Sequence, residues 1–456
     1  MDQELIKFLK DNGVNKNLNE IKVLNLCERG LRNIPSSIGQ LTKLQKLNLS
    51  YNELTNIPDS IGKLTQLRRL YLSCNQLTNI PDSIGKLTEL QVLDLSINKL
   101  TNIPLSIGQL TQLQELDLSD NQLTIILDNI DQLTQLRELY LEKNKLSSIP
   151  MSIGQLPQLQ ILYLENNELS SIPESIGQLM QLRTLNFAYN FIKNIPNSIG
   201  QLIHLQHLYI SHNKLKNIPN SIGQLIHLQH LYMSYNKLKK IPDCIGQLTQ
   251  LQELFLYHNQ LTNISDIISQ LTQLQKLDLS NNKLTNIPLF LIYMPNLQEL
   301  RYSGNEIINL HYAIRRWLDR SKITQNVYDN LQYVYDHNIE PTTIESIKKF
   351  VNTYKPVENI DIIDRIDKTN LNDNTKNLLK SYCDDYVYSM LQLTFSEVLD
   401  FVLDYITNHE NKEELLKILH EKMHESNDKC FYGRLSRLIN TINGYHPCIN
   451  IQIINK

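Results

Sequence analysis

The sequence predicts an α/β solenoid of stacked coils that is followed by an all-α domain. Three observations lead to this fold class: an asparagine recurs every 23 residues, one apolar pattern precedes the asparagines, and both features end near residue 310. No insertion or deletion interrupts the series. Its members are Asn52, Asn75, Asn98, Asn121, Asn144, Asn167, Asn190, Asn213, Asn236, Asn259, Asn282 and Asn305.

The apolar pattern has the form L-x-x-L-x-L-x-x-N, as in the run from Leu44 to Asn52. One period earlier, Arg29 replaces the asparagine while the apolar positions remain, which makes thirteen repeats with a degenerate first one. A fixed period in this range is the signature of a leucine-rich-repeat solenoid. The alternating L-x-L segment predicts a short strand with its leucines inward, and stacked coils would join these strands into one parallel, concave sheet.

The asparagine side chain suits a turn in the interior of the coil. Its amide carries both a donor and an acceptor, so a buried asparagine can bond backbone groups of its own coil and of the neighbouring one. Because the same position recurs in every coil, the asparagines are predicted to form a hydrogen-bonded ladder along the solenoid.

The convex side of each coil is predicted from the residues after the asparagine. Proline follows six residues after that position in ten of the thirteen repeats and leads into S-I-G-Q-L. Proline fixes φ, and the segment suits one turn of α-helix or 3-10 helix, with glycines such as Gly62 relieving the bend. Two repeats depart from this pattern, at Leu127 with Asp131 and at Ser265 with Ser269, which indicates either drift at exposed positions or a local widening of the coil.

Three domains are predicted along the chain. Residues 1–20 contain an amphipathic run that would form a helical cap on the first coil. Residues 21–310 form the solenoid, and residues 311–456 read as a helical domain in which Trp317 would pack on the open end of the coils. Helices are expected near 311–320 and at 342–354, 396–409, 413–424 and 434–442.

Composition excludes several classes of protein. Residues 1–310 carry 26 basic and 26 acidic side chains and residues 311–456 carry 18 and 21, so neither part has the basic excess that nucleic-acid binding requires. No apolar stretch is long enough to span a membrane. The start at Met1 lacks the features of a secretory signal, and the six cysteines form no C-x-x-C pair. We therefore expect an intracellular, cytoplasmic location, or the host cytoplasm if the source is viral.

The repeats resemble a known family. The run Ile57-Pro58, then Ser60-Ile61-Gly62 and onward to Asn75 is similar to the intracellular Ras-group leucine-rich repeat of plant Ras-group proteins and the animal Sur-8/Shoc scaffold. The resemblance covers about residues 21–310. It implies a curved α/β horseshoe with short helices or 3-10 turns on the convex side and a concave face that binds proteins.

The tail carries a second resemblance. Residues 430–440, which read CFYGRLSRLIN, and residues 325–328 are similar to a helical segment found in proteins of giant DNA viruses. The amino-acid composition, which is rich in Asn, Ile and Lys, suits the AT-rich genomes of such viruses. The resemblance implies an amoebal virus or an amoeba-associated bacterium as the source, and it implies no activity.

Aromatic side chains are predicted to line the concave face beside the strand leucines. Five of them share the position four residues before the asparagine: Tyr140, Tyr163, Tyr209, Tyr232 and Phe255. Exposed aromatic rows of this kind mark protein-binding surfaces, although such rings also stabilise neighbouring strands by packing. The candidate partner-binding residues are Tyr140, Tyr163, Tyr189, His207, Tyr209, His230, Tyr232, Tyr235, Phe255 and Tyr257.

An acidic patch is predicted on the same face, towards the N-terminal side. Its members are Asp94, Glu115, Asp117, Asp120, Glu138, Glu142 and Glu165. A partner with a basic segment beside an apolar one would match the acidic and aromatic positions together. The alternative is an ordinary solvated face.

Histidines on adjacent strands raise the question of a metal site. His207 and His230 occupy equivalent positions, and His212 and His258 are near them in the pattern. A zinc site needs three or four converging ligands. However, residues 194–216 and 217–239 differ at only two positions, so duplication of one repeat explains the recurring histidines, and we expect no metal.

The function predicted from these observations is a non-enzymatic scaffold that binds a partner protein on the concave face. We expect no cofactor and no nucleic acid, and the partner is an unknown protein, with a host signalling protein as one candidate. The alternative is a cysteine-dependent ubiquitin ligase, in which the repeats select the substrate and the tail carries the nucleophile. Cys383 lies in a C-x-D motif that suits such a ligase, but the motif is short and its two carboxylates would raise the thiol pKa.

Overall fold

The computed structural model describes residues 3–14, 20–307, 314, 362–382 and 395–424. Contacts divide the chain into two compact units, Met1–Leu310 and His311–Lys456, which are described here one at a time. The first unit is a curved solenoid, and the described part of the second is helical.

One parallel sheet of thirteen strands runs through the solenoid, in the order of the chain. Each strand is three residues long and pairs with the next at an offset of 23 residues, as in Leu208 with Leu231. The predicted fold class is confirmed by this sheet. The strands are β1 (Val23–Asn25), β2 (Lys46–Asn48), β3 (Arg69–Tyr71), β4 (Val92–Asp94), β5 (Glu115–Asp117), β6 (Glu138–Tyr140), β7 (Ile161–Tyr163), β8 (Thr184–Asn186), β9 (His207–Tyr209), β10 (His230–Tyr232), β11 (Glu253–Phe255), β12 (Lys276–Asp278) and β13 (Glu299–Arg301).

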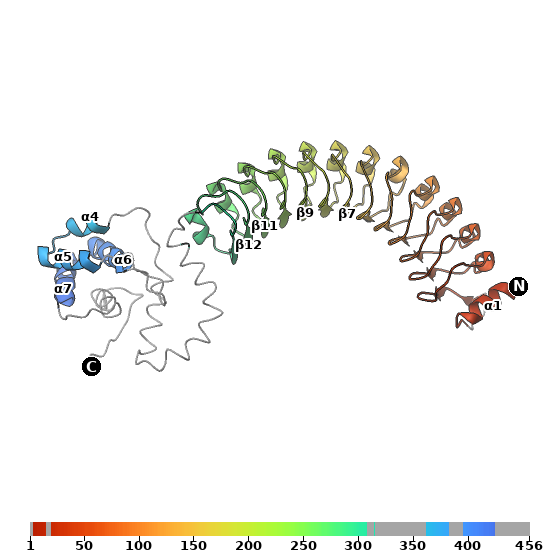
Figure 1. The fold of residues 1–456 in the computed structure, drawn as a ribbon, viewed down its shortest axis with the longest axis horizontal. Helices are drawn as coiled ribbons and strands as arrows, with labels where there is room; N and C mark the ends of the chain where they lie inside the picture. The colour runs from red at the N-terminus through yellow and green to blue at the C-terminus, as the bar shows by residue number, and fades with distance from the viewer. Residues whose placement is uncertain (1–2, 15–19, 308–313, 315–361, 383–394, 425–456) are drawn as a thin grey trace. The chain divides into compact units, whose positions relative to one another are not determined.

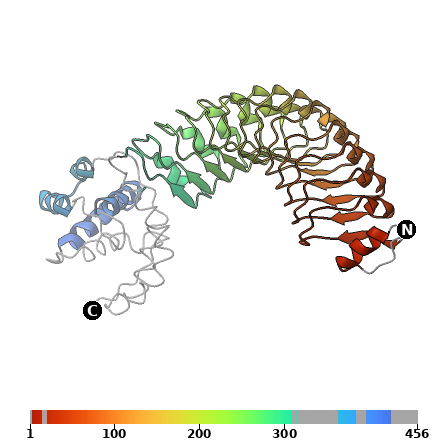
Figure 2. The ribbon, with the colours of Figure 1, turned by 45° about the vertical axis from the view of Figure 1, so that its right-hand side comes forward.

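A five-residue 3-10 turn connects each pair of consecutive strands. Figures 1 and 2 show the strands along the inner side of the arc and these turns along its outer side. The turns are η2 (Ser36–Gln40), η3 (Asp59–Lys63), η4 (Asp82–Lys86), η5 (Leu105–Gln109), η6 (Asp128–Gln132), η7 (Met151–Gln155), η8 (Glu174–Gln178), η9 (Asn197–Gln201), η10 (Asn220–Gln224), η11 (Asp243–Gln247), η12 (Asp266–Gln270) and η13 (Leu289–Tyr293). The two irregular repeats also form five-residue turns, η6 and η12. Their sequence differences therefore leave the geometry of the coil unchanged.

The interior of the solenoid is filled by aliphatic side chains from both sides of each coil. The central leucines of the strands, such as Leu70 and Leu208, and the isoleucines of the turns, such as Ile61, are fully buried. At the N-terminal end the helix α1 (Gln3–Asp11) lies against η2 and buries Leu5 and Leu9. Its apolar face therefore covers the first coil, as a terminal cap must.

The asparagines form a ladder of hydrogen bonds between coils. Oδ1 of Asn98 accepts a hydrogen bond from the backbone N–H of Leu77 at 3.0 Å. Its Nδ2 donates hydrogen bonds to the carbonyl oxygens of Leu72 at 3.0 Å and Leu95 at 3.1 Å. The same set of bonds recurs at Asn213, with Ile192, Phe187 and Ile210. Each buried amide thus satisfies backbone groups that the turn would otherwise leave without partners.

The glycines of the 3-10 turns have a different role from the predicted relief of a bend. They do not adopt positive φ, but a Cβ on Gly200 would lie 2.6 Å from the carbonyl oxygen of Ser221 in the next turn. Glycine is needed because adjacent turns approach each other closely. The degenerate positions Asp131 and Ser269 show that a side chain can be accommodated there in particular coils.

The described part of the second unit consists of four helices: α4 (Ile362–Asp367), α5 (Asp373–Tyr382), α6 (Phe395–Asn408) and α7 (Lys412–His424). α5 and α6 both contact α7, and apolar side chains such as Leu403 and Leu419 are buried between them. α6 and α7 lie where helices 396–409 and 413–424 are predicted. The predicted helices at 342–354 and 434–442, and Trp317, lie outside the described residues.

Within the described ranges of the chain, no helix has both the length and the apolar character that crossing a bilayer requires.

Candidate protein-binding surfaces

The strand geometry decides which side chains reach the concave face. Leucines point inward, so the residues six, four and two positions before each asparagine point outward, and the 23-residue register aligns them in rows across the sheet. Most of these side chains are half-buried, because each leans on its equivalents in neighbouring coils. The rows are therefore continuous surfaces.

We define the aromatic surface as Tyr140, Tyr163, Tyr209, Tyr232 and Phe255. Tyr209 and Tyr232 make an edge contact with ring centroids 5.0 Å apart, and Tyr232 stacks on Phe255 at 4.4 Å. Tyr140 and Tyr163 form a separate edge contact at 5.5 Å. These contacts show that the rings do pack between strands, while all five side chains remain partly open to solvent.

The aromatic surface consists of two groups of rings. Asn186 occupies the row between Tyr163 and Tyr209, and its Nδ2 donates to Oε2 of Glu165 at 2.8 Å. The polar pair separates the Tyr140–Tyr163 group from the Tyr209–Tyr232–Phe255 group. The aromatic surface therefore has two patches, one beside carboxylates and one beside histidines.

Glu253 connects Tyr232 of the second aromatic group to His230 and Lys276. The hydroxyl of Tyr232 donates to this carboxylate, His230 Nδ1 lies 3.2 Å from it, and Lys276 Nζ lies 2.9 Å from it. Burial alone would raise the pKa of Glu253, but these hydrogen bonds outweigh it and lower the pKa to about 2. Burial and the same contact raise the pKa of Tyr232. Glu253 is thus a carboxylate whose charge is satisfied within the protein.

We define the acidic surface as Asp94, Glu115, Asp117, Glu138, Glu142 and Glu165. Asp94 pairs in register with Asp117, and Glu115 with Glu138, so like charges lie side by side. No basic residue occupies the concave rows of the strands β4 to β8. Asp120, predicted to belong to this patch, lies one residue before its asparagine and pairs with Lys143 at 3.6 Å.

The acidic surface is short of counter-ions within the described chain. Burial raises the pKa values of Glu115, Asp117 and Glu142, and nearby carboxylates add to the effect. Oε2 of Glu142 is buried and accepts no hydrogen bond from any described residue. Asp117 is partly compensated, since Ser119 donates both its backbone N–H and its hydroxyl to it at 2.9 and 2.6 Å. A cation from outside would relieve this repulsion.

A further row of rings crosses the sheet at the ends of the strands, where the chain leaves them. We call Tyr189, His212, Tyr235 and His258 the ring ledge. Each of these residues stands one position before its asparagine, with φ between 52° and 54°. Their rings stack in sequence, with centroids 3.9, 4.0 and 4.2 Å apart. Tyr257 meets the ledge from the concave side through an edge contact with Tyr235 at 5.3 Å.

Sequence reasoning found Tyr189 and Tyr235 but left out the two histidines that complete the ledge. Their shared register one residue before the asparagine is the signal that could have found them. His207 and His230 stack separately on the sheet at 4.8 Å. Among the side chains that the structure describes, no three His, Cys, Asp or Glu groups converge as metal ligands would.

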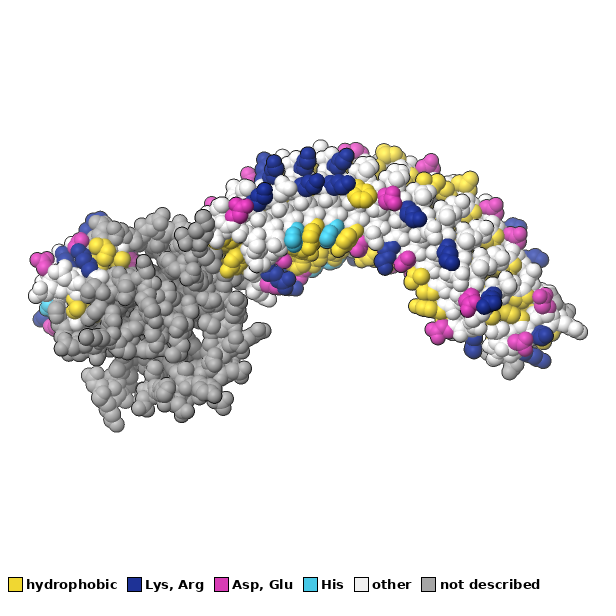
Figure 3. All heavy atoms as spheres, viewed as in Figure 1, with side chains coloured by type: hydrophobic (Ala, Val, Ile, Leu, Met, Phe, Trp, Pro, Cys, Tyr) yellow, Lys and Arg dark blue, Asp and Glu magenta, His cyan; other side chains and the backbone are white. Residues whose placement is uncertain are grey.

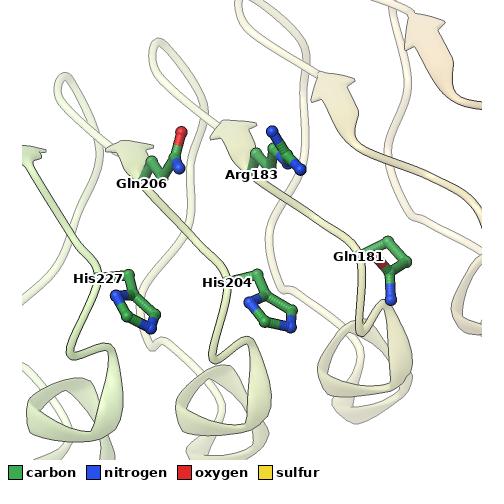
Figure 4. A pocket seen from close by; sticks show the side chains of 5 residues that line it. All are labelled: Gln181, Arg183, His204, Gln206 and His227. Carbon is green, nitrogen blue, oxygen red and sulfur yellow. The ribbon is translucent and has the colours of Figure 1, made fainter.

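A shallow hollow of about 280 Å³ lies on the flank where the chain enters the strands (Figure 4). It is lined by Gln181, Arg183, His204, Gln206 and His227. Figure 4 shows His204 and His227 side by side between the 3-10 turns and the strands, and their rings are 6.3 Å apart. Cys383, the candidate nucleophile of the ligase alternative, lies outside the described residues.

The comparisons with known proteins agree with this architecture. The family model described as a leucine-rich repeat region matches residues 12–122, 116–200 and 174–333. None of the curated proteins matches the chain.

Solved structures with similar folds come from bacteria and plants. A leucine-rich-repeat protein of Leptospira interrogans is 35% identical over 69% of this chain and 90% of that chain, with a TM-score of 0.55. An internalin of Listeria monocytogenes is 25% identical over 64% of this chain and 83% of that one, with a TM-score of 0.57. The Arabidopsis receptor kinase HAESA, solved with a peptide hormone and a co-receptor, is 29% identical over 64% of this chain and 54% of that chain, with a TM-score of 0.50.

The matched family model covers well over half of the sequence, and the thirteen coils carry its repeat from end to end. The chain belongs to the leucine-rich-repeat family.

Proposed function

We propose that this protein is a non-enzymatic scaffold that binds a partner polypeptide on the concave face of its repeats. Leucine-rich-repeat solenoids generally mediate protein–protein interactions. The observation that carries the proposal is a half-buried aromatic group, Tyr209, Tyr232 and Phe255, on the same concave sheet as carboxylates that form no ion pair with any described residue.

The two surfaces indicate the chemistry of the partner. Aromatic side chains contribute large contact areas at low entropic cost, so the Tyr209 group suits an apolar or aromatic segment. The acidic surface suits lysine or arginine, which would neutralise Glu138 and Glu142 and could lie over the Tyr140 ring. A polypeptide with a basic segment beside an apolar one matches both surfaces along one sheet.

We also propose that the repeats are of the Ras-group type and act inside the cell. Support comes from the I-P-x-S-I-G signature and the 23-residue period. The peptide-hormone complex of HAESA supports the use of a repeat solenoid as a polypeptide receptor.

Affinity capture from an extract of cells that make the protein tests the proposal, with the Tyr209→Ala, Tyr232→Ala double variant beside the unchanged chain. Removing the two rings should weaken capture of the partner by about tenfold or more, because central aromatic anchors carry much of the binding energy. Thermal unfolding measured on the same samples should stay cooperative, with a midpoint lowered by the lost ring contacts but well above the temperature of the capture, since both residues point out of the core.

The matched control replaces Ile203 and Ile226 by alanine, because these isoleucines are exposed outside the concave sheet at 43% and 51%. Capture by this control should equal capture by the unchanged chain. Equal capture by the tyrosine variant would overturn the proposed surface.

A further inference from the structure

A long stretch of the solenoid contains no acidic residue. Between Glu174 and Asp243 the sequence carries seven lysines and arginines and five histidines but no aspartate or glutamate. The preceding residues 89–174 carry twelve acidic and only four basic side chains. We call residues 89–174 the acidic block and residues 175–242 the basic block. The near-zero charge of the whole solenoid hides this separation.

Six lysines of the basic block lie on one side of the coils. They follow the ladder asparagines, on the flank where the chain leaves the strands, and all six are exposed. None of them forms an ion pair with a described residue, and Lys214 lies over the ring of Phe191 at 4.3 Å. We define the lysine flank as Lys193, Lys214, Lys216, Lys237, Lys239 and Lys240.

The ring ledge borders the lysine flank, since its residues immediately precede the asparagines that the lysines follow. Figure 3 shows the dark-blue side chains gathered over this part of the arc, next to a row in which cyan and yellow side chains alternate. Because the rings stack on one another, their polar edges, with tyrosine hydroxyls and imidazole nitrogens, are what the ledge offers to a ligand.

We propose that the lysine flank, together with the ring ledge, binds an acidic polypeptide segment. Six ammonium groups that form no ion pair with any described residue complement a run of aspartate and glutamate. The tyrosine and histidine edges can donate hydrogen bonds to carboxylates at the border of the patch. The lysines of this surface lie outside the concave rows, and the ring ledge borders those rows at Tyr257.

A single-stranded nucleic acid fits the flank less well. Such strands are held by bases that stack on free aromatic faces. Here the inner faces of the four rings already cover each other at 3.9 to 4.2 Å, so no base can enter between them. The flank also offers lysines rather than the arginines that recognise phosphate in a bidentate manner.

The test measures binding of a fluorescein-labelled polyglutamate peptide to the full chain by fluorescence anisotropy. The comparison probes are an oligothymidylate of equal charge and an uncharged peptide of equal length. Polyglutamate should bind at low salt, bind more weakly as salt is raised, and bind more tightly than the oligonucleotide. Replacing Lys214, Lys216, Lys237 and Lys239 by glutamate should weaken it by about tenfold or more.

A matched variant makes the same change of net charge outside the basic block: Lys63→Glu, Lys86→Glu, Lys99→Glu and Lys145→Glu. It should retain polyglutamate binding to within about twofold, and circular dichroism should show both variants folded. Equal losses in the two variants, tighter binding of the oligonucleotide, or no binding of polyglutamate at low salt would each overturn the proposal. A dimer at low salt that only the flank variant abolishes would assign the flank to a second copy and would also contradict it.

Discussion

The acidic block and the basic block are built from the same coil and differ in the side chains that face solvent. Asn121 in the first and Asn213 in the second make the same hydrogen bonds, and the strand leucines of both are fully buried. Yet one block carries twelve acidic residues against four basic ones, and the other carries seven basic residues and no acidic one. The coil therefore separates positions that hold the fold from positions that are free to define a binding surface.

The first prediction concerns the structural positions, where the two blocks should not differ. Replacing Asn121 or Asn213 by alanine removes one acceptor and the donors to two carbonyl oxygens, all of them buried. Each variant should lose about 3–5 kcal/mol in urea-induced unfolding, because each orphaned buried group costs about 1–3 kcal/mol. Losses that differ by more than about 1 kcal/mol between the blocks would break the comparison.

The second prediction contrasts a glycine of the basic block with its counterpart in the acidic block. Gly200→Ala would place a Cβ 2.6 Å from the carbonyl oxygen of Ser221, whereas Asp131 already carries a Cβ at the equivalent position. We expect Gly200→Ala to cost about 1–3 kcal/mol and Asp131→Ala to be nearly neutral in the same unfolding measurement. A neutral Gly200→Ala would mean that the turns are not packed as closely as described.

The third prediction uses the left-handed residue before each asparagine. Ile97 holds φ at 52° as an exposed β-branched residue, while His212 holds 54° but stacks on two rings. Ile97→Asn should raise the free energy of unfolding by about 0.5–1 kcal/mol, because asparagine tolerates this conformation. His212→Asn should instead lower it by about 0.5–1.5 kcal/mol, because two ring contacts are lost. A gain of stability in both variants would show that the ledge adds no stability.

The fourth prediction, with the smallest effect, uses pH to compare Glu142 with Glu253. The pKa of Glu142 is raised in the folded protein, so the folded state takes up its proton first as pH falls from about 7 to about 5, and this group then favours folding. The unchanged chain should gain a few tenths of a kcal/mol more over that range than Glu142→Gln does. Unfolding midpoints at the two pH values provide the measurement.

Glu253 is the control for this pH effect, since its pKa is lowered to about 2. A carboxylate of this kind contributes stability above its ordinary pKa and loses it only as pH falls from there towards 2. Glu253→Gln should therefore be destabilised equally at both pH values. If Glu142→Gln gains as much free energy of unfolding on acidification as the unchanged chain does, Glu142 is not the group whose protonation relieves the repulsion.

The sequence predicts the coil better than it predicts the surfaces. Asn52 and its equivalents are recognisable because one amide must satisfy the same backbone groups in every repeat. The ring ledge is harder to recognise: its residues share the position before the asparagine, but that position also accepts Tyr51, Ile97 and Lys143, because only its left-handed backbone is common to all coils.

Other surface features depend on contacts between neighbouring coils, or on differences in charge between them, and a pattern shared by all repeats shows neither. The sequence already places Asn186 in the aromatic row, but its hydrogen bond to Glu165, which stands two residues before the preceding asparagine, follows only from the three-dimensional register. The lysine flank depends on the distribution of charge between coils, which the balanced total conceals. The short helix α4 has too few residues to show a clear apolar period.

Selection of a displayed random-peptide library on the full chain tests the central claim most directly. The account predicts that enriched peptides place lysine or arginine beside an aromatic or aliphatic residue. These peptides should lose binding to the Tyr209→Ala, Tyr232→Ala variant and to a Glu138→Gln, Glu142→Gln variant. Enriched peptides that bind both variants as tightly as the unchanged chain would contradict a concave face that recognises polypeptides through these two surfaces.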